Sequence, residues 1–300
     1  MADGWKVVHM KIVITAPFAA QQVEELKGQH EVLFSPQDDS TPLRSEEQLH
    51  SLLAEERAEI FITESDRVTA QVLEGLDDLK LLCVCRTGLN NIDIPACTDH
   101  GVALVNAPGR NAAAVADMVM ALFIDMSRFL FEGEKLLRSG QWDEGIYYRL
   151  RGHELYGNTV ATIGFGAIPK ELAKRISGFG MKMIAYDPYV SAEIMASYGV
   201  EKVTLEEAFS GGDYVTLHLP VTEQTRHMVN RDLLKLMKPS AYFVNAARSA
   251  IVVEEDVLEL LEKHRIAGAA FDVYEEEPLG LDSRFLKLDH TILIPHLGGA

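Results

Sequence analysis

The sequence contains few cysteines, few prolines and no long apolar run. Its three cysteines, Cys83, Cys85 and Cys97, form no C-x-x-C pair, so buried thiols in a reducing compartment are the favoured interpretation. No apolar segment approaches the length of a membrane span, and the N-terminus lacks the apolar core of a secretory signal. These absences predict a cytoplasmic protein.

Basic residues are in the minority. Lys and Arg number 28 against 45 Asp and Glu, which gives a formal net charge of −17. Because nucleic-acid affinity depends on clustered Lys and Arg, and anionic membranes repel an acidic surface, we expect no nucleic-acid partner and no membrane partner. An anionic small-molecule substrate is not excluded, since a local pocket of Arg can bind one.

The sequence also lacks the residue patterns of metal sites and of Ser/His/Asp catalysis. The ten histidines show no metal-ligand spacing, so no metal is expected. No nucleophile elbow for Ser/His/Asp catalysis is found. What remains is a chain of 300 residues with 47% hydrophobic content, which is long enough for two ordinary globular domains.

A dinucleotide-binding pattern occupies the middle of the chain. A short β-rich strand ends at Gly164-Phe-Gly166, apolar residues at helical spacing follow over 169–177, and the next strand ends in Asp187. Such a turn lets backbone N–H groups approach a pyrophosphate at a helix N-terminus. Asp187 can accept hydrogen bonds from both ribose hydroxyls and would repel the 2′-phosphate of NADP. The pattern favours NAD, and a βαβ unit without a ligand is the alternative.

Pro169 replaces the third glycine of this pattern. Proline is tolerated in the first helical turn, because its missing N–H would have no intrahelical partner there. Ala167 and Ile168 are therefore expected to present their N–H groups to the phosphates. What the proline removes is glycine's close approach of helix to strand.

Alternating strands and helices predict two α/β domains, over residues 1–107 and 108–300. Strands are expected over 11–15, 31–34, 59–63, 81–85, 102–105, 160–163, 182–186, 214–218, 242–245, 267–271 and 291–294. Helices are expected over 21–27, 45–56, 70–76, 169–177, 192–198, 231–237 and 254–263. Continuously apolar strands fit parallel sheets that are covered on both faces, so both domains are expected to be doubly wound.

The segment 112–138 is predicted to be a long, mostly apolar helix with an interruption near 129–133. Its length and its all-round apolarity exceed what one small domain needs. Burial between domains or in a dimer is therefore the expected use of this helix.

Three polar residues, Arg248, Glu277 and His296, each follow a predicted strand of the second half. The carboxyl ends of strands in one parallel sheet meet at one rim, so these side chains are expected to converge. Arg binds a carboxylate through paired hydrogen bonds, and His exchanges a proton near neutral pH. A Glu bonded to that His orients the ring and favours its charged form. Oxidation of a 2-hydroxy acid, or reduction of a 2-oxo acid, requires this set.

Each of these residues also has a plainer interpretation. Glu277 lies in an acidic run that solvent could simply cover, and His296 could be a turn residue. His218 could face the core or a cofactor. Arg86 lies in a glycine-containing loop after the fourth predicted strand, where it could bring a cation to a ligand or lie in solvent.

Several longer motifs occur together in the order typical of one family. They are RTGLNNID (86–93), VNAPGRNAAAVAD (105–117), GFGAIP (164–169), AYDPY (185–189), LHLPVTEQT (217–225), MKPSAYFVNAARSAIVVEEDVL (237–258), AGAAFDVYEEEPL (267–279) and TILIPHLGG (291–299). With these motifs the chain resembles the D-isomer-specific 2-hydroxyacid dehydrogenases, in their phosphoglycerate-dehydrogenase-like branch. The resemblance implies a flavodoxin-like substrate domain and a Rossmann NAD-binding domain.

The resemblance also implies residue roles. Arg248 would bind the substrate carboxylate, His296 would be the acid/base and Glu277 its partner. Homodimers would form through the segment after the first domain. The substrate contacts implied in the first domain are Arg86, Thr87 and Gly88. The implied cofactor-binding residues are Gly164, Gly166, Ala167, Ile168, Asp187, His218, Pro220, Thr225, Ala246, Asp272 and Gly298, with Asp272 near the nicotinamide amide.

Two further departures from the family pattern accompany Pro169. Ser249 replaces the glycine that usually follows the catalytic Arg, which matters if φ is positive there. The chain ends at Ala300, where the family normally continues into a helix that returns to the first domain. The substrate domain is therefore expected to lack that helix.

The leading hypothesis is NAD-dependent interconversion of a small D-2-hydroxy acid, phosphorylated or not, and its 2-oxo acid. A nucleotide-sensing binding protein on the same scaffold is the alternative, and the three departures support it. A complete set of Arg248, Glu277 and His296 argues against a sensor, which needs no acid/base pair. A related NAD enzyme with another substrate class is a third, weaker alternative.

Overall fold

The computed structural model of the chain describes residues 9–37 and 42–299. Residues 1–8, 38–41 and 300 lie outside these ranges, and so does the chain end on which the predicted lack of a return helix depends. The chain divides into two compact units, residues 1–110 and 111–300. Each unit has its own parallel sheet and its own hydrophobic core.

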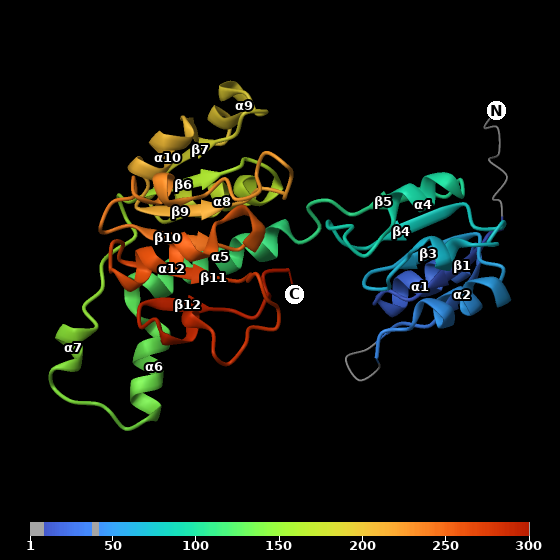
Figure 1. Cartoon of the computed structure of the whole chain (residues 1–300), viewed down its shortest axis with the longest axis horizontal. Coiled ribbons are helices and arrows are strands. Elements are labelled where there is room, and N and C mark those ends of the chain that lie inside the picture. Colours follow the sequence, from blue (N-terminus) through green and yellow to red (C-terminus); the bar gives the residue numbers. More distant parts are fainter. Residues whose placement is uncertain (1–8, 38–41, 300) are drawn as a thin grey trace. The chain divides into compact units, whose positions relative to one another are not determined.

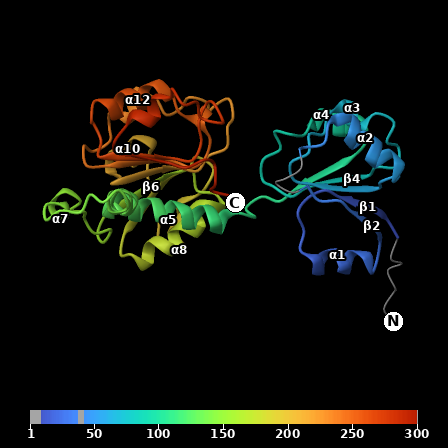
Figure 2. The same ribbon diagram turned by 90° about the horizontal axis from the view of Figure 1, so that it is seen from below.

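Unit 1 is built on a five-stranded parallel sheet. Its strands are β1 (Lys11–Ile14), β2 (Glu31–Phe34), β3 (Ile60–Thr63), β4 (Leu81–Val84) and β5 (Ala103–Asn106). The strand order β2-β1-β3-β4-β5 is the flavodoxin-like doubly wound order. Helix α1 (Ala20–Lys27) covers one face, and the other face carries α2 (Glu46–Glu55), α3 (Ala70–Leu73) and α4 (Ile94–Asp99) (Figure 2).

Local signals explain where the helices of unit 1 begin and end. Helix α2 starts at a capping box, in which Ser45 accepts the N–H of Gln48 and the Gln48 side chain accepts the N–H of Ser45. Helix α3 stops at Leu73, short of the predicted end at 76, and Gly75 follows with a φ of 74°. Helix α4 was not predicted, although Asp93 caps its first turn.

Unit 2 contains a seven-stranded parallel sheet (Figure 1). Its strands are β6 (Thr159–Ile163), β7 (Lys182–Tyr186), β8 (Glu201–Lys202), β9 (Tyr214–Leu217), β10 (Tyr242–Asn245), β11 (Gly268–Phe271) and β12 (Thr291–Leu293). Counted from β6, the order β12-β11-β10-β9-β6-β7-β8 is the Rossmann order with one strand added beside β11. Both predicted doubly wound sheets are therefore confirmed. Every residue of β9, β10 and β11 is buried, as expected for strands covered on both faces.

Helices cover both faces of the second sheet (Figure 2). One face carries α5 (Ala112–Arg128) and α8 (Ala167–Gly178), and the other carries α10 (Leu205–Gly211), α11 (Arg231–Leu234) and α12 (Glu254–Glu262). Shorter elements are α7 (Ile146–Arg149), α9 (Ala192–Ala196) and the 3₁₀ turns Ser249–Ile251 and Arg284–Lys287. Strand β8 and helix α10 were not predicted, and α9 and α11 end earlier than expected.

The predicted apolar helix over 112–138 is two helices. Helix α5 ends at Arg128, Phe129 follows with a φ of 55° that breaks the helix, and α6 runs over Leu130–Arg138. The expectation of burial between domains or in a dimer is wrong for α5, because its apolar residues pack in the core of unit 2 against α8 and the sheet. Helix α6 has no buried residue. Within the described residues, no helix is both long and apolar enough to cross a membrane.

Candidate active site

The glycine turn lies where the strand order reverses, between β6 and β9. Gly164 has a φ of 98°, and a Cβ there would lie 2.5 Å from the carbonyl oxygen of His218. Only glycine fits this position. Gly166 caps α8, and a Cβ on it would meet nothing within 4 Å. Open space therefore lies beside the helix N-terminus, where a phosphate group would bind.

Pro169 fits this turn without loss. Helix α8 begins at Ala167, earlier than predicted, so Pro169 lies in the first turn and is buried. The backbone N–H of Lys170 is the first to bond back, to the carbonyl oxygen of Gly166 at 3.3 Å. The N–H groups of Ala167 and Ile168 lie in the first turn, where no intrahelical acceptor exists.

Asp187 connects the end of β7 to the glycine turn. Its Oδ2 accepts the N–H of Phe165 at 2.9 Å, and its Oδ1 accepts the N–H groups of Tyr189 and Val190 at 2.8 and 3.2 Å. The predicted ribose-binding carboxylate is thus held in place by three backbone donors.

His218 follows β9 and faces the same turn. Its Nε2 lies 3.1 Å from Oγ1 of Thr216, and its buried Nδ1 has no partner among the described residues. Burial lowers the pKa of His218 far below the ordinary value, so the ring is neutral. The loop after it is closed by Thr225, whose hydroxyl donates to the carbonyl oxygen of Pro220 at 2.7 Å.

Arg248 lies on a short turn that begins where β10 ends. Asn245, the last residue of β10, is buried and holds the turn with both ends of its amide. Its Oδ1 accepts the N–H of Ala247 and its Nδ2 donates to the carbonyl oxygen of Arg248, each at 3.1 Å. The Arg248 side chain is exposed and donates to the carbonyl oxygen of Ala247 at 2.6 Å. Ala246 lies within this turn and is half-buried.

Ser249 is the serine that stands where the family pattern has a glycine after the catalytic Arg. It begins a 3₁₀ turn, and it is not among the residues of positive φ in the described ranges. A serine fits this backbone without strain.

Glu277 and His296 form the predicted pair. His296 Nδ1 lies 2.8 Å from Glu277 Oε2, and Glu277 Oε1 accepts the N–H of Tyr274 at 3.0 Å. Burial raises the pKa of Glu277, but the hydrogen bonds from His296 and Tyr274 lower it more, so the carboxylate is ionised at neutral pH. Because Nδ1 is engaged, Nε2 of His296 is the nitrogen left to exchange a proton. The His296 side chain is 47% exposed.

The segment that carries His296 is held from a neighbouring strand. His296 has a φ of 53°, which is uncommon for a residue with a side chain. The buried Asp272, which follows β11, accepts the N–H of Leu297 on Oδ1 at 2.7 Å and that of Gly298 on Oδ2 at 2.9 Å. A Cβ on Gly298 would lie 2.8 Å from Asp272 Oδ2, so the two segments approach closely.

Sequence reasoning missed one part of this arrangement and described another incompletely. Asn245 was not singled out, although an Asn at the end of a strand, just before a turn, is a known signal for side chain–backbone bonding. Asp272 was expected near the nicotinamide amide. In the structure both of its oxygens hold the His296 segment, a long-range contact with no local signal.

In unit 1, the loop with the predicted substrate contacts follows β4. The carbonyl oxygen of Thr87 accepts a hydrogen bond from the Asn106 side chain at 2.9 Å, which ties the loop to the end of β5. Arg110 pairs with Glu64 at 2.6 Å, whereas Arg86 is half-buried and forms no ion pair within the described ranges. Gly88 lies in the same loop.

Fold and site together define a Rossmann-type α/β protein with a glycine turn and a histidine–glutamate pair at the carboxyl rim of its sheet. The family model for the D-isomer specific 2-hydroxyacid dehydrogenase, NAD binding domain, matches residues 120–298. The chain therefore belongs to the D-isomer specific 2-hydroxyacid dehydrogenase family, whose cofactor is NAD(H).

Individual relatives agree with this assignment. The D-3-phosphoglycerate dehydrogenase of Methanocaldococcus jannaschii is 36% identical over 97% of this chain, which spans only 54% of that protein. The glyoxylate reductase of Thermococcus onnurineus is 38% identical over 79% of the chain and 72% of its own length. Among solved structures, the D-lactate dehydrogenase of Escherichia coli matches 97% of this chain and 90% of its own, with a TM-score of 0.76 and 28% identity.

Two structural observations fit the cofactor of this family. Open space lies beside Gly166 at the N-terminus of α8, where N–H groups without intrahelical acceptors can bind phosphate oxygens. The buried Nδ1 of His218 still lacks a partner within the described ranges, so a polar group of a ligand can satisfy it.

Proposed function

We propose that the protein is an NAD-dependent oxidoreductase that interconverts a small D-2-hydroxy acid and its 2-oxo acid. The observation that carries this proposal is the 2.8 Å contact between His296 and Glu277 at the carboxyl rim of the sheet, on which Arg248 and the glycine turn also lie. A binding protein would have no use for a proton-exchanging pair on this rim.

The residues of unit 2 divide the chemistry between them. Arg248 is proposed to hold the substrate carboxylate through paired hydrogen bonds. His296 would give its Nε2 proton to the carbonyl oxygen during reduction and take the hydroxyl proton during oxidation. Ionised Glu277 keeps the ring oriented and stabilises the imidazolium. Bound NAD(H) supplies or accepts the hydride at substrate C2.

The proposed cofactor contacts follow from the same geometry. The N–H groups of Ala167 and Ile168 would bind phosphate, while Asp187 would accept the ribose hydroxyls with the lone pairs that its backbone donors leave free. The remaining proposed contacts are Gly164, Gly166, His218, Pro220, Thr225, Ala246, Asp272 and Gly298.

The substrate contacts proposed in unit 1 depend on the positive charge of Arg86. Arg86 has no ion pair within the described ranges, whereas Arg110 is engaged by Glu64. Arg86, with Thr87 and Gly88, is therefore proposed to bind the substrate. Residues 1–107 would form the substrate domain and 108–300 the dinucleotide-binding domain.

The nucleotide-sensing alternative loses support. Pro169 lies in the first turn of α8, and Ser249 has no positive φ, so neither departure disturbs the site. Both residues are compatible with an active enzyme.

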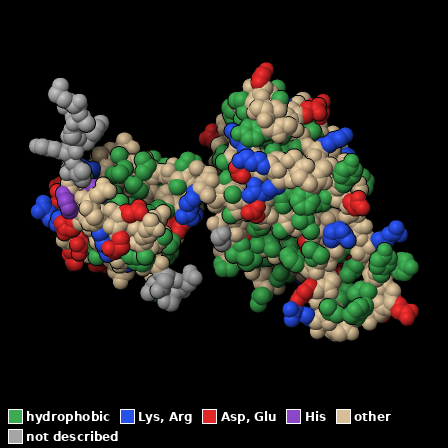
Figure 3. Space-filling view, turned by 180° about the vertical axis from the view of Figure 1, so that it is seen from behind, with side chains coloured by type: hydrophobic (Ala, Val, Ile, Leu, Met, Phe, Trp, Pro, Cys, Tyr) green, Lys and Arg blue, Asp and Glu red, His purple; other side chains and the backbone are tan. Residues whose placement is uncertain are grey.

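We further propose a cytoplasmic homodimer. Helix α6, helix α7 and the segment between them expose large apolar side chains, and Figure 3 shows such side chains gathered at the lower right of that view. The residues concerned are Leu130, Phe131, Leu137, Trp142, Tyr147 and Tyr148. Apolar exposure of this extent favours a protein partner. Sedimentation should give about twice the chain mass, and a monomer at micromolar concentration would contradict the dimer.

A screen of 2-oxo acids with NADH, followed by absorbance, tests the activity. Glyoxylate, hydroxypyruvate and 3-phosphohydroxypyruvate distinguish unphosphorylated from phosphorylated substrates. NADPH should be used poorly, and Asp187→Ala should narrow the preference by removing both the ribose acceptor and the repulsive charge. Absence of turnover with every 2-oxo acid, despite NADH binding, would favour the sensor.

A further inference from the structure

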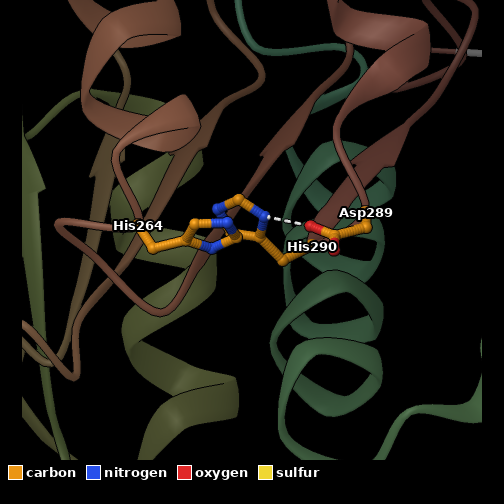
Figure 4. Close-up of side chains that lie close together, drawn as sticks. All are labelled: His264, Asp289 and His290. Carbon is orange, nitrogen blue, oxygen red and sulfur yellow. Dashed lines mark hydrogen bonds and ion pairs between the residues drawn. The ribbon is translucent and has the colours of Figure 1, made fainter.

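A second cluster of chemically competent side chains lies at the opposite edge of the unit 2 sheet (Figure 4). His264 follows α12, and Asp289 and His290 come directly before β12. Residues that precede parallel strands lie at the amino edge, whereas His296 follows β12 at the carboxyl edge. Each of the three residues offers one donor atom, and these atoms lie within 4.8 Å of one another.

His290 is prepared to act as a ligand. Its Nδ1 lies 2.8 Å from Oδ1 of Asp289, and a carboxylate at Nδ1 leaves the lone pair on Nε2. That Nε2 is buried and has no hydrogen-bond partner in the described part of the chain. The His290 side chain is 17% exposed, and its carbonyl oxygen accepts the N–H of Ala269 at 3.2 Å, so the sheet holds it in place. A buried nitrogen of this kind is costly unless something binds it.

His264 brings a second imidazole to the same place. Its ring stacks on that of His290, with centroids 4.6 Å apart and planes inclined by 27°. The backbone is held at the end of α12, where His264 has a φ of 46° and its N–H bonds to Leu261. The residue is exposed, so its ring can turn about the side-chain bonds while the backbone stays fixed. Figure 4 shows the two rings one over the other, with Asp289 beyond His290.

We propose that His264 and Nε2 of His290 bind a divalent transition-metal ion, with Zn²⁺ as the best match and Asp289 as the hydrogen-bond partner that orients His290. Two imidazoles suit Zn²⁺, Co²⁺, Ni²⁺ or Cu²⁺, whereas Mg²⁺ and Ca²⁺ require sets of oxygen ligands. At bond lengths of about 2.0–2.1 Å, tetrahedral donors lie about 3.3 Å apart, so a rotation of the exposed His264 ring completes the site. Water would fill the remaining coordination.

The position of the cluster defines what the metal would do. It would join the end of α12 to the start of β12, two segments that are distant in the sequence. The ion would stabilise unit 2 by binding the folded state alone. The proton-exchanging pair lies at the other edge of the sheet, so the ion would take no part in the reaction. Histidine spacing in the sequence could not reveal this cluster, because folding alone brings His264 beside His290.

Zn²⁺ titration of the full, untagged chain, stripped with EDTA, tests the proposal. We expect one Zn²⁺ per chain by calorimetry, a rise in the unfolding temperature with Zn²⁺ but not with Mg²⁺, and visible absorption from bound Co²⁺. His264→Ala and His290→Ala should each abolish the thermal shift. Asp289→Asn should weaken binding by about 10–100-fold, as loss of a carboxylate partner of a ligating histidine does elsewhere.

A matched variant separates this site from the protein's other histidines. His100→Ala removes an exposed histidine at the end of α4, and it should bind Zn²⁺ as the parent does. Because binding is read without turnover, failure of the proposed enzyme activity would leave this test intact. Two results would overturn the proposal: no Zn²⁺-dependent thermal shift in the parent, or the same shift in His264→Ala as in the parent. His264→Ala is the decisive variant, since an exposed side chain can be removed without unfolding the core.

Discussion

Two segments carry the proposed catalytic side chains at the rim of the unit 2 sheet, and they are held in different ways. The turn with Arg248 is held by Asn245, three residues earlier in the chain, through one donated and one accepted hydrogen bond. The segment with His296 is held by Asp272, which lies on the neighbouring strand end and accepts two N–H groups. The hydrogen bonds of Asn245 form a local clamp, made by a neutral side chain within one turn. The hydrogen bonds of Asp272 form a long-range clamp, made by a carboxylate between two strand ends. His296, which must direct one ring nitrogen, is thus held from outside its own segment. Arg248, which has a long and flexible side chain, is held by a residue of its own turn.

The largest effect should come from removing the group that the long-range clamp positions. His296→Ala should lower turnover by about 10²–10⁴-fold, the usual value of general acid–base help. NADH binding, followed by fluorescence titration, should stay close to that of the parent, because the ring acts on substrate. Near-parent turnover in this variant would remove the proposed mechanism.

Replacing Asp272, the residue of the long-range clamp, should have the next largest effect on turnover. In Asp272→Asn one acceptor oxygen becomes an NH₂ group, which would face the N–H of Leu297 or Gly298. Two hydrogen-bond donors would then oppose each other, and one of the two hydrogen bonds would be lost. We expect a loss of about 10²-fold in kcat, the effect of displacing a catalytic group by about 1 Å.

Stability distinguishes this positioning role from a structural one. Burial is the main cause that raises the pKa of Asp272, and the two backbone hydrogen bonds only partly oppose it. Burial of the ionised form therefore costs stability at neutral pH, and a neutral Asn relieves that cost. Asp272→Asn should lose far more activity than thermal stability. Parallel losses would show that the residue merely supports the fold.

This contrast also explains what could be predicted from the sequence. Local signals were sufficient for the Ser45 capping box, the strand–glycine–helix unit at Gly164 and the alternation that produced both sheet types. The residues Arg248, Glu277 and His296 were identified from their positions after strands, and the structure brings Glu277 and His296 into contact.

What could not be predicted depends on contacts between distant segments. The two hydrogen bonds that Asp272 accepts from the His296 segment, and the meeting of His264 with His290, arise only when parallel strands align. The helix over 112–138 was assigned to an interface because its apolarity was visible while its partner α8 was not. Short elements such as β8 and α4 have too few residues to show a periodic pattern of hydrophobic residues.

Breaking the local clamp should have a smaller effect. Asn245→Ala removes both bonds to the Arg248 turn, each worth about 1 kcal/mol net, so we expect about a 30-fold loss in kcat/KM. The loss should appear mainly in KM for the 2-oxo acid, because Arg248 is proposed to bind the carboxylate. Asn245→Asp keeps the acceptor for Ala247 but loses the donor to the Arg248 carbonyl, so it should rescue little. A loss confined to kcat would contradict this role for the turn.

The smallest change in rate, but the most diagnostic, should come from Glu277→Gln. The carboxylate is ionised because hydrogen bonds from His296 and Tyr274 outweigh the effect of burial and lower its pKa. Its charge stabilises the imidazolium, and a neutral amide does not. Reduction needs the protonated ring and therefore declines as pH rises. The variant lacks that charge, so reduction should decline at a lower pH than in the parent. Oxidation needs the neutral ring and should begin at a lower pH, so the two directions of the reaction change oppositely at a fixed pH near the transition. Profiles of kcat for both directions measure this, and an unchanged pair of profiles would mean that Glu277 orients the ring without setting its charge.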